Sequence, residues 1–166
     1  MIMNFLALDF ETANYYQDSA CALGLVRVED NKIIHRTSFL IRPPYRYFVF
    51  THIHGITWGD VEDQPTFDQC WKSIKPFFEG IDFAVAHNAG FDKGVLRACC
   101  RRYAITPPDL DFQCTMKLSR KVFNLYPTNL PAVCRNFNID LQHHDALSDT
   151  LACAKIMIEI IRKTNT

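Results

Sequence analysis

The sequence predicts an α/β domain in three layers, with a central mixed β-sheet flanked by helices. Residues 4–10 form an apolar run without polar alternation, which is typical of a strand buried on both faces. Residues 22–28 and 33–41 are strand-like runs separated by the turn sequence Glu-Asp-Asn-Lys, which predicts a hairpin. After this hairpin, helical and strand-like segments alternate to the end of the chain, as in α/β domains.

Apolar stripes, caps and breakers define the segments that follow the hairpin. Thr66 is the expected N-cap of a helix whose apolar face ends at Phe78, with Gly80 just beyond it. The aromatic-rich stretch before this helix, residues 45–58, has no regular period and is predicted to be irregular. Short strands are expected at residues 82–86 and 112–114, and helices at residues 91–103, 116–123, 130–137 and 146–162.

The composition excludes several classes of protein. The chain has 166 residues, which suits one domain with a sizeable core, and its 48% hydrophobic and 22% charged residues argue against disorder. Eighteen basic residues balance 18 acidic ones, so the formal net charge is zero. This balance argues against a protein that coats long nucleic acid by charge alone, but it leaves room for a small basic groove.

The sequence favours a cytoplasmic protein. No apolar run reaches the length of about 18 residues that a membrane span requires. The N-terminal run lacks the basic segment and the cleavage site of a signal peptide. The seven cysteines are odd in number and include no CxxC pair, so we expect reduced thiols that serve as small core residues.

Four acidic residues occupy positions where burial is expected. Asp9 and Glu11 lie at the end of the first strand and point to one face, with Phe10 on the other, because a strand has a period of two. Asp92 and Asp149 each lie on the apolar stripe of a predicted helix. Neighbouring carboxylates at a buried edge repel one another and lose hydration unless a cation holds them.

Each acid also has an ordinary structural explanation when it is taken alone. Asp92 would favour the dipole of its helix, Glu11 would serve a cap or turn, and Asp149 would pair with an arginine. Together, the four acids favour an oxygen-rich site for a hard divalent cation such as Mg²⁺ or Mn²⁺.

His144 is a candidate general base. It precedes Asp149 by five residues, which would place it about 500° around a helix, so the two side chains would not share a helical face. We therefore expect His144 on the loop that enters the last helix. Beside a metal site its pKa near neutrality suits proton transfer, whereas a solvated loop histidine is the alternative.

Three ordered motifs resemble those of the DEDD exonuclease superfamily. Residues 9–12 (Asp-Phe-Glu-Thr), 87–92 (His-Asn-Ala-Gly-Phe-Asp) and 144–149 (His-Asp-Ala-Leu-Ser-Asp) are similar to its first, second and third motifs. The histidine in the third motif indicates the DEDDh branch, typified by the proofreading epsilon subunit of bacterial DNA polymerase III. Residues 53–57 (Ile-His-Gly-Ile-Thr) also resemble a loop of that subunit.

The resemblance implies a ribonuclease-H-like fold and a single exonuclease domain over residues 1–166. It implies metal-dependent 3′→5′ hydrolysis that releases nucleoside monophosphates from the 3′ end of mainly single-stranded DNA. Asp9, Glu11, Asp92 and Asp149 would hold two divalent cations, Mg²⁺ or Mn²⁺, and His144 would deprotonate the attacking water. Two cations about 4 Å apart can activate water on one side and stabilise the leaving oxygen on the other.

The same resemblance implies a set of substrate contacts. Thr12 would bind the terminal nucleotide, and Asn88 would lie near the strand end. Ile53, His54 and Phe91 would pack around or stack on the terminal base, a contact that tolerates any base. Core packing is the alternative for Ile53 and Phe91, and a satisfied loop histidine is the alternative for His54.

The expected partner is single-stranded DNA or a frayed 3′ end. Three alternatives stay open: an RNA-trimming 3′–5′ exoribonuclease of the same branch, a non-catalytic nucleic-acid-binding domain on the same fold, and a protein with a structural metal. The polymerase-binding tail of the epsilon subunit has no counterpart after the last helix, so we expect a stand-alone nuclease. The sequence does not decide whether it forms a homodimer.

Overall fold

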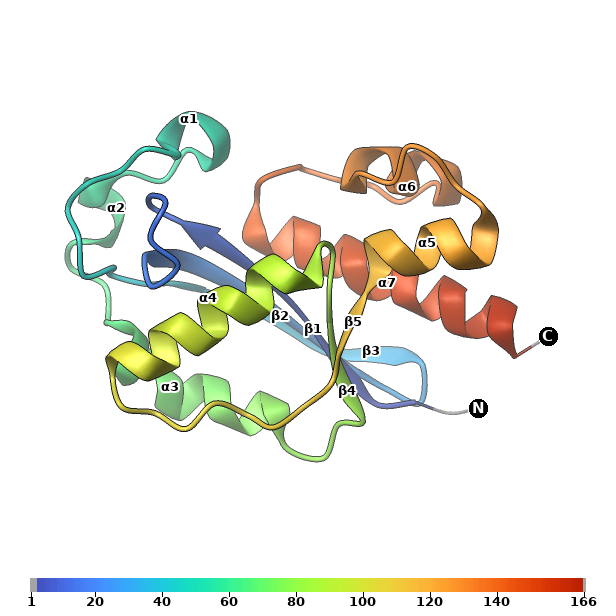
Figure 1. Ribbon diagram of the computed structural model, residues 1–166, viewed down its shortest axis with the longest axis horizontal. Coiled ribbons are helices and arrows are strands. Elements are labelled where there is room, and N and C mark those ends of the chain that lie inside the picture. The colour runs from blue at the N-terminus through green and yellow to red at the C-terminus, as the bar shows by residue number, and fades with distance from the viewer. Residues whose placement is uncertain (1–2, 166) are drawn as a thin grey trace.

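A five-stranded mixed sheet lies at the centre of the structure (Figure 1). The computed structural model describes residues 3–165, so residues 1, 2 and 166 of the predicted domain lie outside the described residues. The strand order is β3-β2-β1-β4-β5, with the first three strands antiparallel and β4 and β5 added in parallel. The strands are β1 (Phe5–Thr12), β2 (Ala20–Glu29), β3 (Lys32–Leu40), β4 (Phe83–Ala86) and β5 (Phe112–Cys114).

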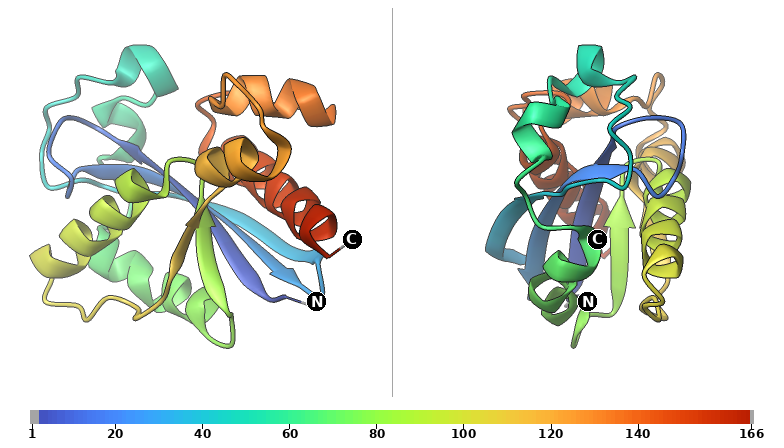
Figure 2. Two further views of the ribbon diagram at one scale, coloured as in Figure 1. Left: turned by 45° about the vertical axis from the view of Figure 1, so that its right-hand side comes forward. Right: turned by 90° about the vertical axis from the view of Figure 1, so that its left-hand side faces the viewer.

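Helices cover both faces of this sheet, and Figure 2 shows α4 and α7 on opposite sides of it. The helical segments are α1 (Thr51–His54), α2 (Trp58–Val61), α3 (Phe67–Ile74), the 3₁₀ turn η1 (Lys75–Phe78), α4 (Ala89–Arg102), α5 (Thr115–Phe123), α6 (Leu130–Phe137) and α7 (Ala146–Thr164). The three-layer α/β architecture that the sequence predicted is therefore confirmed.

Strand β1 is buried on both faces, as its unbroken apolar run predicted. Leu6, Leu8 and Phe10 belong to the core that the sheet forms with α3 and α4. Phe5 and Ala7 face the opposite core, formed with α5, α6 and α7. Because side chains alternate along a strand, Asp9 and Glu11 continue the series of Phe5 and Ala7 toward the α7 layer.

Several boundaries differ from the predicted ones for local reasons. The helix expected to reach Phe78 ends as an α-helix at Ile74, because Pro76 has no amide hydrogen to donate and a 3₁₀ turn takes over. Helix α4 begins at Ala89, two residues earlier than expected, after Asn88 turns the chain with a φ of 73°. The stretch expected to be irregular contains the two short helices α1 and α2.

Gly24 allows helix α7 to lie directly on β2. A Cβ atom at this position would overlap the carbonyl oxygen of Ala146 and the hydroxyl of Thr150. The register of the sheet places Gly24 opposite Asp9. The close approach at Gly24 therefore sets the height of the first turns of α7, which carry Asp149, above β1.

All seven cysteines are free thiols and six of them are buried, as predicted. Within residues 3–165 there is no helix with the length and apolar character needed to cross a membrane.

Candidate functional site

Three of the predicted carboxylates meet where β1 passes under α7. One ligand oxygen from each of Asp9, Glu11 and Asp149 lies within 4.8 Å of the others. Strand β4 pairs with β1 only as far as Ala7, so the site lies beyond the end of that pairing. Two acids from one strand and a third from a distant helix thus converge at an open end of the sheet.

Asp149 is buried, and its two oxygens have different surroundings. Oδ2 accepts hydrogen bonds from Nδ1 of His143 at 2.9 Å and from the backbone amide of His144 at 3.1 Å. Oδ1 is fully buried and has no hydrogen-bond partner among the described residues. A buried carboxylate oxygen without a partner is costly and uncommon in native proteins. The free oxygen therefore fits a cation ligand.

Asp92 belongs to the same region but plays a different structural part. It is only 1% exposed in the first turn of α4, and its Oδ1 accepts a hydrogen bond from the amide of Phe10 at 2.9 Å. It is not a member of the three-carboxylate cluster, although its negative charge raises the pKa values of both Asp9 and Glu11. One Asp92 oxygen thus ties α4 to β1 between the two β1 acids.

The four carboxylates raise one another's affinity for positive charge. Burial first, and then the charges of Asp92 and Glu11, hold the pKa of Asp9 well above its ordinary value. Burial and the charge of Asp149 raise the pKa of Glu11 to about 8. Burial raises the pKa of Asp92 to about 7 and also raises that of Asp149. Such a cluster binds protons or cations at neutral pH.

His144 lies on the loop before α7, as predicted. A φ of 68° turns the loop at this residue, and the Asp145 side chain caps α7 by accepting a hydrogen bond from the Ser148 amide at 2.8 Å. The His144 ring stacks on that of His143 with centroids 3.7 Å apart. Burial and the nearby His143 lower the pKa of His144, so its imidazole is neutral at neutral pH.

Both ring nitrogens of His54 form hydrogen bonds with the backbone. Nε2 donates to the carbonyl oxygen of Thr12 at 3.0 Å, and Nδ1 accepts from the amide of Ile56 at 3.1 Å. A cavity of about 150 Å³ is lined by both His54 and His144. The structure therefore brings these two predicted residues to one cavity, where His54 fixes the backbone next to Glu11.

The other predicted substrate residues lie at the surface or beside the acids. Ile53 on α1 and Phe91 in the first turn of α4 are each 41% exposed, so core packing does not explain either side chain. Asn88 is exposed, and its side chain makes no hydrogen bond that caps α4. Thr12 is buried at the end of β1.

Two histidines in this region have contacts that sequence reasoning missed. His143 holds Asp149, and its only signal in the sequence is the doublet with His144. His87 bridges the end of β4 to the opposite wall, with ring nitrogens 2.8 Å from the Thr115 hydroxyl and 2.9 Å from the Thr128 carbonyl oxygen. The only feature of the sequence that pointed to His87 was its position inside the second motif.

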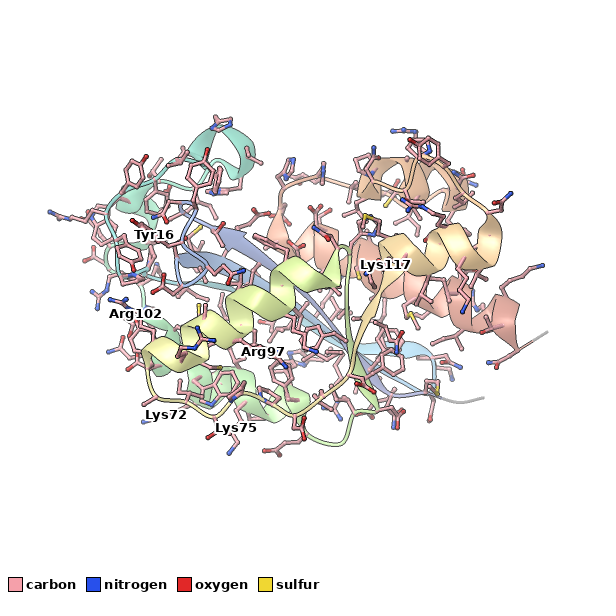
Figure 3. The ribbon with its side chains drawn as sticks, viewed as in Figure 1. Tyr16, Lys72, Lys75, Arg97, Arg102 and Lys117 are labelled. Atoms are coloured by element: carbon pink, nitrogen blue, oxygen red, sulfur yellow. The ribbon has the colours of Figure 1, made fainter. Side chains whose placement is uncertain are left out.

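None of the four predicted carboxylates lines either of the two larger cavities. Figure 3 shows exposed cations spread over several elements, including Lys75, Arg97 and Lys117. A cavity of about 680 Å³ lies between the β1–β2 loop and the C-terminal part of α4, lined by Tyr16 and Arg102 among others. Arg102 already forms an ion pair with Asp18 at 3.0 Å. Chemistry, rather than cavity size, identifies the candidate site.

Known proteins are similar in sequence to this chain over most of its length. Escherichia coli (strain K12) Exodeoxyribonuclease 10 is 32% identical over 165 residues, which cover 93% of this chain and 67% of that protein. A Mycobacterium tuberculosis (strain CDC 1551 / Oshkosh) protein whose name proposes a bifunctional exonuclease/endonuclease is 33% identical over 153 residues. The match covers 88% of this chain and only 23% of the M. tuberculosis protein, so the chain spans about a quarter of its length.

Solved structures share the fold over nearly the whole chain. Exonuclease X in complex with 5′ overhanging duplex DNA has a TM-score of 0.77 at 27% identity, covering 98% of this chain and 93% of that chain. The nuclease domain of 3′hExo, a DEDDh family member bound to rAMP, has a TM-score of 0.82 at 16% identity, covering 97% and 92%, which shows the ribonuclease-H-like fold alone.

A family model described as Exonuclease, RNase_T, matches residues 6–157. This span contains all three sequence motifs, from Asp9 in the first to Asp149 in the third. The resemblance to an exonuclease family is thereby confirmed, and the chain belongs to the family that this model describes as Exonuclease.

Proposed function

We propose that the chain is a metal-dependent 3′→5′ exonuclease that releases nucleoside monophosphates from the 3′ end of mainly single-stranded DNA. Asp9, Glu11, Asp92 and Asp149 are the proposed ligands of two divalent cations, and His144 is the proposed general base. We further propose that residues 1–166 form a single exonuclease domain that works in the cytoplasm.

The environment of Asp149 is the main observation that supports this proposal. Its Oδ1 is buried without a hydrogen-bond partner among the described residues, and its carboxylate lies within 4.8 Å of those of Asp9 and Glu11. An all-oxygen donor set of this kind suits Mg²⁺ and Mn²⁺. When bound, such cations polarise the phosphate and lower the pKa of water, which is the chemistry that phosphodiester hydrolysis needs.

The chain's own residues then supply proton transfer and alignment. His144 is neutral, and neither of its ring nitrogens has a hydrogen-bond partner among the described residues, so one nitrogen is available to take a proton from water. The hydrogen bond from its backbone amide to Asp149 ties the position of the base to a metal ligand. The Asp92–Phe10 hydrogen bond fixes β1 between Asp9 and Glu11.

The terminal nucleotide is proposed to lie between α1 and the start of α4. Ile53 and Phe91 offer exposed apolar surface for the terminal base, which suits stacking without sequence preference. Thr12 and Asn88 are proposed to contact the sugar and phosphate. His54 is proposed to act mainly by positioning Thr12, because its Nε2 holds the Thr12 carbonyl oxygen.

DNA is favoured over RNA by the more similar relatives. Exodeoxyribonuclease 10 at 32% identity and the DNA complex of Exonuclease X at 27% identity both point to deoxyribonucleotide substrates. The structure bound to rAMP is only 16% identical and carries no argument about the sugar. A single strand or a frayed 3′ end is therefore the proposed partner.

A single assay tests polarity, sugar and metal together. Oligonucleotides of one sequence, made as single-stranded DNA, blunt duplex DNA and RNA, carry a label at the 5′ or the 3′ end and are incubated with Mg²⁺, Mn²⁺ or a chelator. The proposal expects 5′-labelled single-stranded DNA to shorten one nucleotide at a time and the 3′ label to leave as a mononucleotide. Faster shortening of RNA, release of the 5′ label first, or full activity in chelator would each contradict it.

A further inference from the structure

The loop before α7 brings two histidines and one carboxylate together. In an extended chain, adjacent side chains point to opposite sides. Here the left-handed backbone at His144 turns the loop, so the rings of His143 and His144 stack at 3.7 Å with an interplanar angle of 24°. His143 Nδ1 lies 2.9 Å from Asp149 Oδ2, and donor atoms of all three residues lie within 4.8 Å of one another.

This donor set differs in kind from the oxygen cluster beside it. Asp9, Glu11 and Asp149 offer only carboxylate oxygens, which suit Mg²⁺ and Mn²⁺, whereas imidazole nitrogens favour Zn²⁺ and similar transition metals. With bonds of about 2.0–2.2 Å, two ligands of a tetrahedral Zn²⁺ lie about 3.3–3.6 Å apart. The His143 and Asp149 atoms are 2.9 Å apart, so they need to separate only slightly to reach that spacing.

We propose that His143, His144 and Asp149 form a second metal site, which takes Zn²⁺ or a similar transition-metal dication and inhibits the enzyme. Zn²⁺ takes the place of the hydrogen between His143 Nδ1 and Asp149 Oδ2, and that proton moves through solvent to His143 Nε2, so the imidazole stays neutral. Water completes the tetrahedron. Asp149 belongs to both groups of donor atoms, and its Oδ1, which has no partner among the described residues, stays available to a cation of the carboxylate cluster.

Inhibition follows from the chemistry of His144 and rests on the proposed function. A neutral imidazole has one nitrogen with a free lone pair. When that lone pair binds Zn²⁺, it cannot accept a proton from water, so the general base is lost while the carboxylate cluster stays intact. This inhibition does not require His143 to take part in hydrolysis. His143 contributes a further nitrogen ligand, which allows Zn²⁺ to bind where His144 alone would not hold it.

Zinc binding is tested without reference to activity. Calorimetric titration of ZnCl₂ is carried out in saturating Mg²⁺ on Asp9→Asn, which weakens the oxygen cluster and isolates the histidine site. Loss of an outer-shell partner alone weakens metal binding about 10–100-fold, so adding His143→Ala should weaken Zn²⁺ binding by at least about tenfold. Adding His35→Ala instead should change nothing, because His35 is an exposed histidine on β3 whose ring packs edge-on against Phe77 at 5.1 Å.

Equal Zn²⁺ affinity in the Asp9→Asn protein with and without His143→Ala would overturn the proposed site. Nitrogen-15 spectra of the histidine rings give a second measurement, in which Zn²⁺ should shift the His143 and His144 signals and leave those of His35 unmoved. Unmoved His143 and His144 signals at saturating Zn²⁺ would likewise overturn it.

Inhibition by Zn²⁺ is tested with His143→Ala and His35→Ala, each made alone in the wild-type protein. At saturating Mg²⁺, the Zn²⁺ concentration that halves each protein's own rate should rise at least about tenfold in His143→Ala and stay unchanged in His35→Ala. Equal inhibition of His143→Ala and wild type would overturn the inhibitory role. If the chain proves to have no nuclease activity, the proposed function fails, yet the calorimetric result still decides the zinc site.

Discussion

The carboxylate of Asp92 accepts a hydrogen bond from the backbone amide of Phe10 across 2.9 Å, and this bond joins helix α4 to strand β1. Phe10 lies between Asp9 and Glu11, beyond the last residue of β1 that pairs with β4. The bond therefore replaces a sheet contact where the strands separate. Asp92 therefore has a structural role in addition to its proposed role as a metal ligand.

The structural role and the proposed metal-binding role of Asp92 can be separated by substitution. Asp92→Asn keeps an oxygen that accepts from the Phe10 amide, so stability should change little while nuclease activity is lost. Asp92→Ala leaves that buried amide without an acceptor, which costs about 1–3 kcal/mol more. Urea denaturation of both variants measures the difference, and equal unfolding free energies would show that the bond to Phe10 contributes nothing.

The proposed base is tested by His144→Ala. Removing a positioned general base lowers kcat by about 10²–10⁴-fold, whereas Mn²⁺ affinity should stay near that of the wild type because the carboxylates remain. Rates and calorimetric Mn²⁺ affinities are compared with those of His35→Ala, which should match the wild type in both. A His144→Ala protein that loses Mn²⁺ binding but keeps its rate at excess Mn²⁺ would contradict the assignment.

The contact at Gly24 predicts a mutation that acts on the site from a distance. Gly24→Ala forces a Cβ into the first turn of α7, where it meets backbone as well as Thr150. Overpacking of this kind costs about 1–3 kcal/mol, and displacement of Asp149 should weaken Mn²⁺ binding. Gly59→Ala is the matched control, because its Cβ would come no closer than 3.7 Å to Thr57. Unchanged stability and Mn²⁺ affinity in Gly24→Ala would argue against this contact.

The raised pKa values predict how stability depends on pH and metal. In the metal-free protein, the folded state holds protons on Glu11 up to about pH 8 and on Asp92 up to about pH 7, well above their ordinary pKa values. These groups therefore stabilise the fold at acid pH, and the contribution is lost as pH rises through those values.

Cations compete with those protons, so the rise in melting temperature on adding Mn²⁺ should be larger at about pH 8 than at about pH 6. Thermal unfolding with and without Mn²⁺ at both pH values measures this difference. Glu11→Gln, which removes one titrating carboxylate, should reduce it. A Mn²⁺ effect that is independent of pH would show that these carboxylates do not hold the cation.

The sequence predicted the parts of the fold that depend on periodicity. The unbroken apolar run of β1, the hairpin and the apolar stripe of α7 each reflect burial against a neighbouring layer, so the order of elements and the three layers followed. The burial of Asp92 and Asp149 was visible for the same reason, because both lie on helical stripes that face the core.

Features that depend on tertiary contacts were not visible in the sequence. The bond from Asp92 to Phe10 joins residues 82 positions apart, and the contact of His143 with Asp149 needs the left-handed turn at His144. The stop at Ile74 was readable from Pro76, but the short helices α1 and α2 carry no apolar period because they are too short to have one.

The most direct test compares Mn²⁺ binding and DNA hydrolysis in wild type and Asp149→Asn. The substitution keeps the size of the side chain and removes the negative charge from the residue whose buried oxygen has no partner within the described chain. Calorimetry and a single-stranded DNA assay are run on the same preparations. We predict that the wild type binds Mn²⁺ and shortens DNA from its 3′ end, and that Asp149→Asn folds normally but loses both properties together. An Asp149→Asn protein that binds Mn²⁺ and hydrolyses DNA as the wild type does would contradict the proposed metal centre.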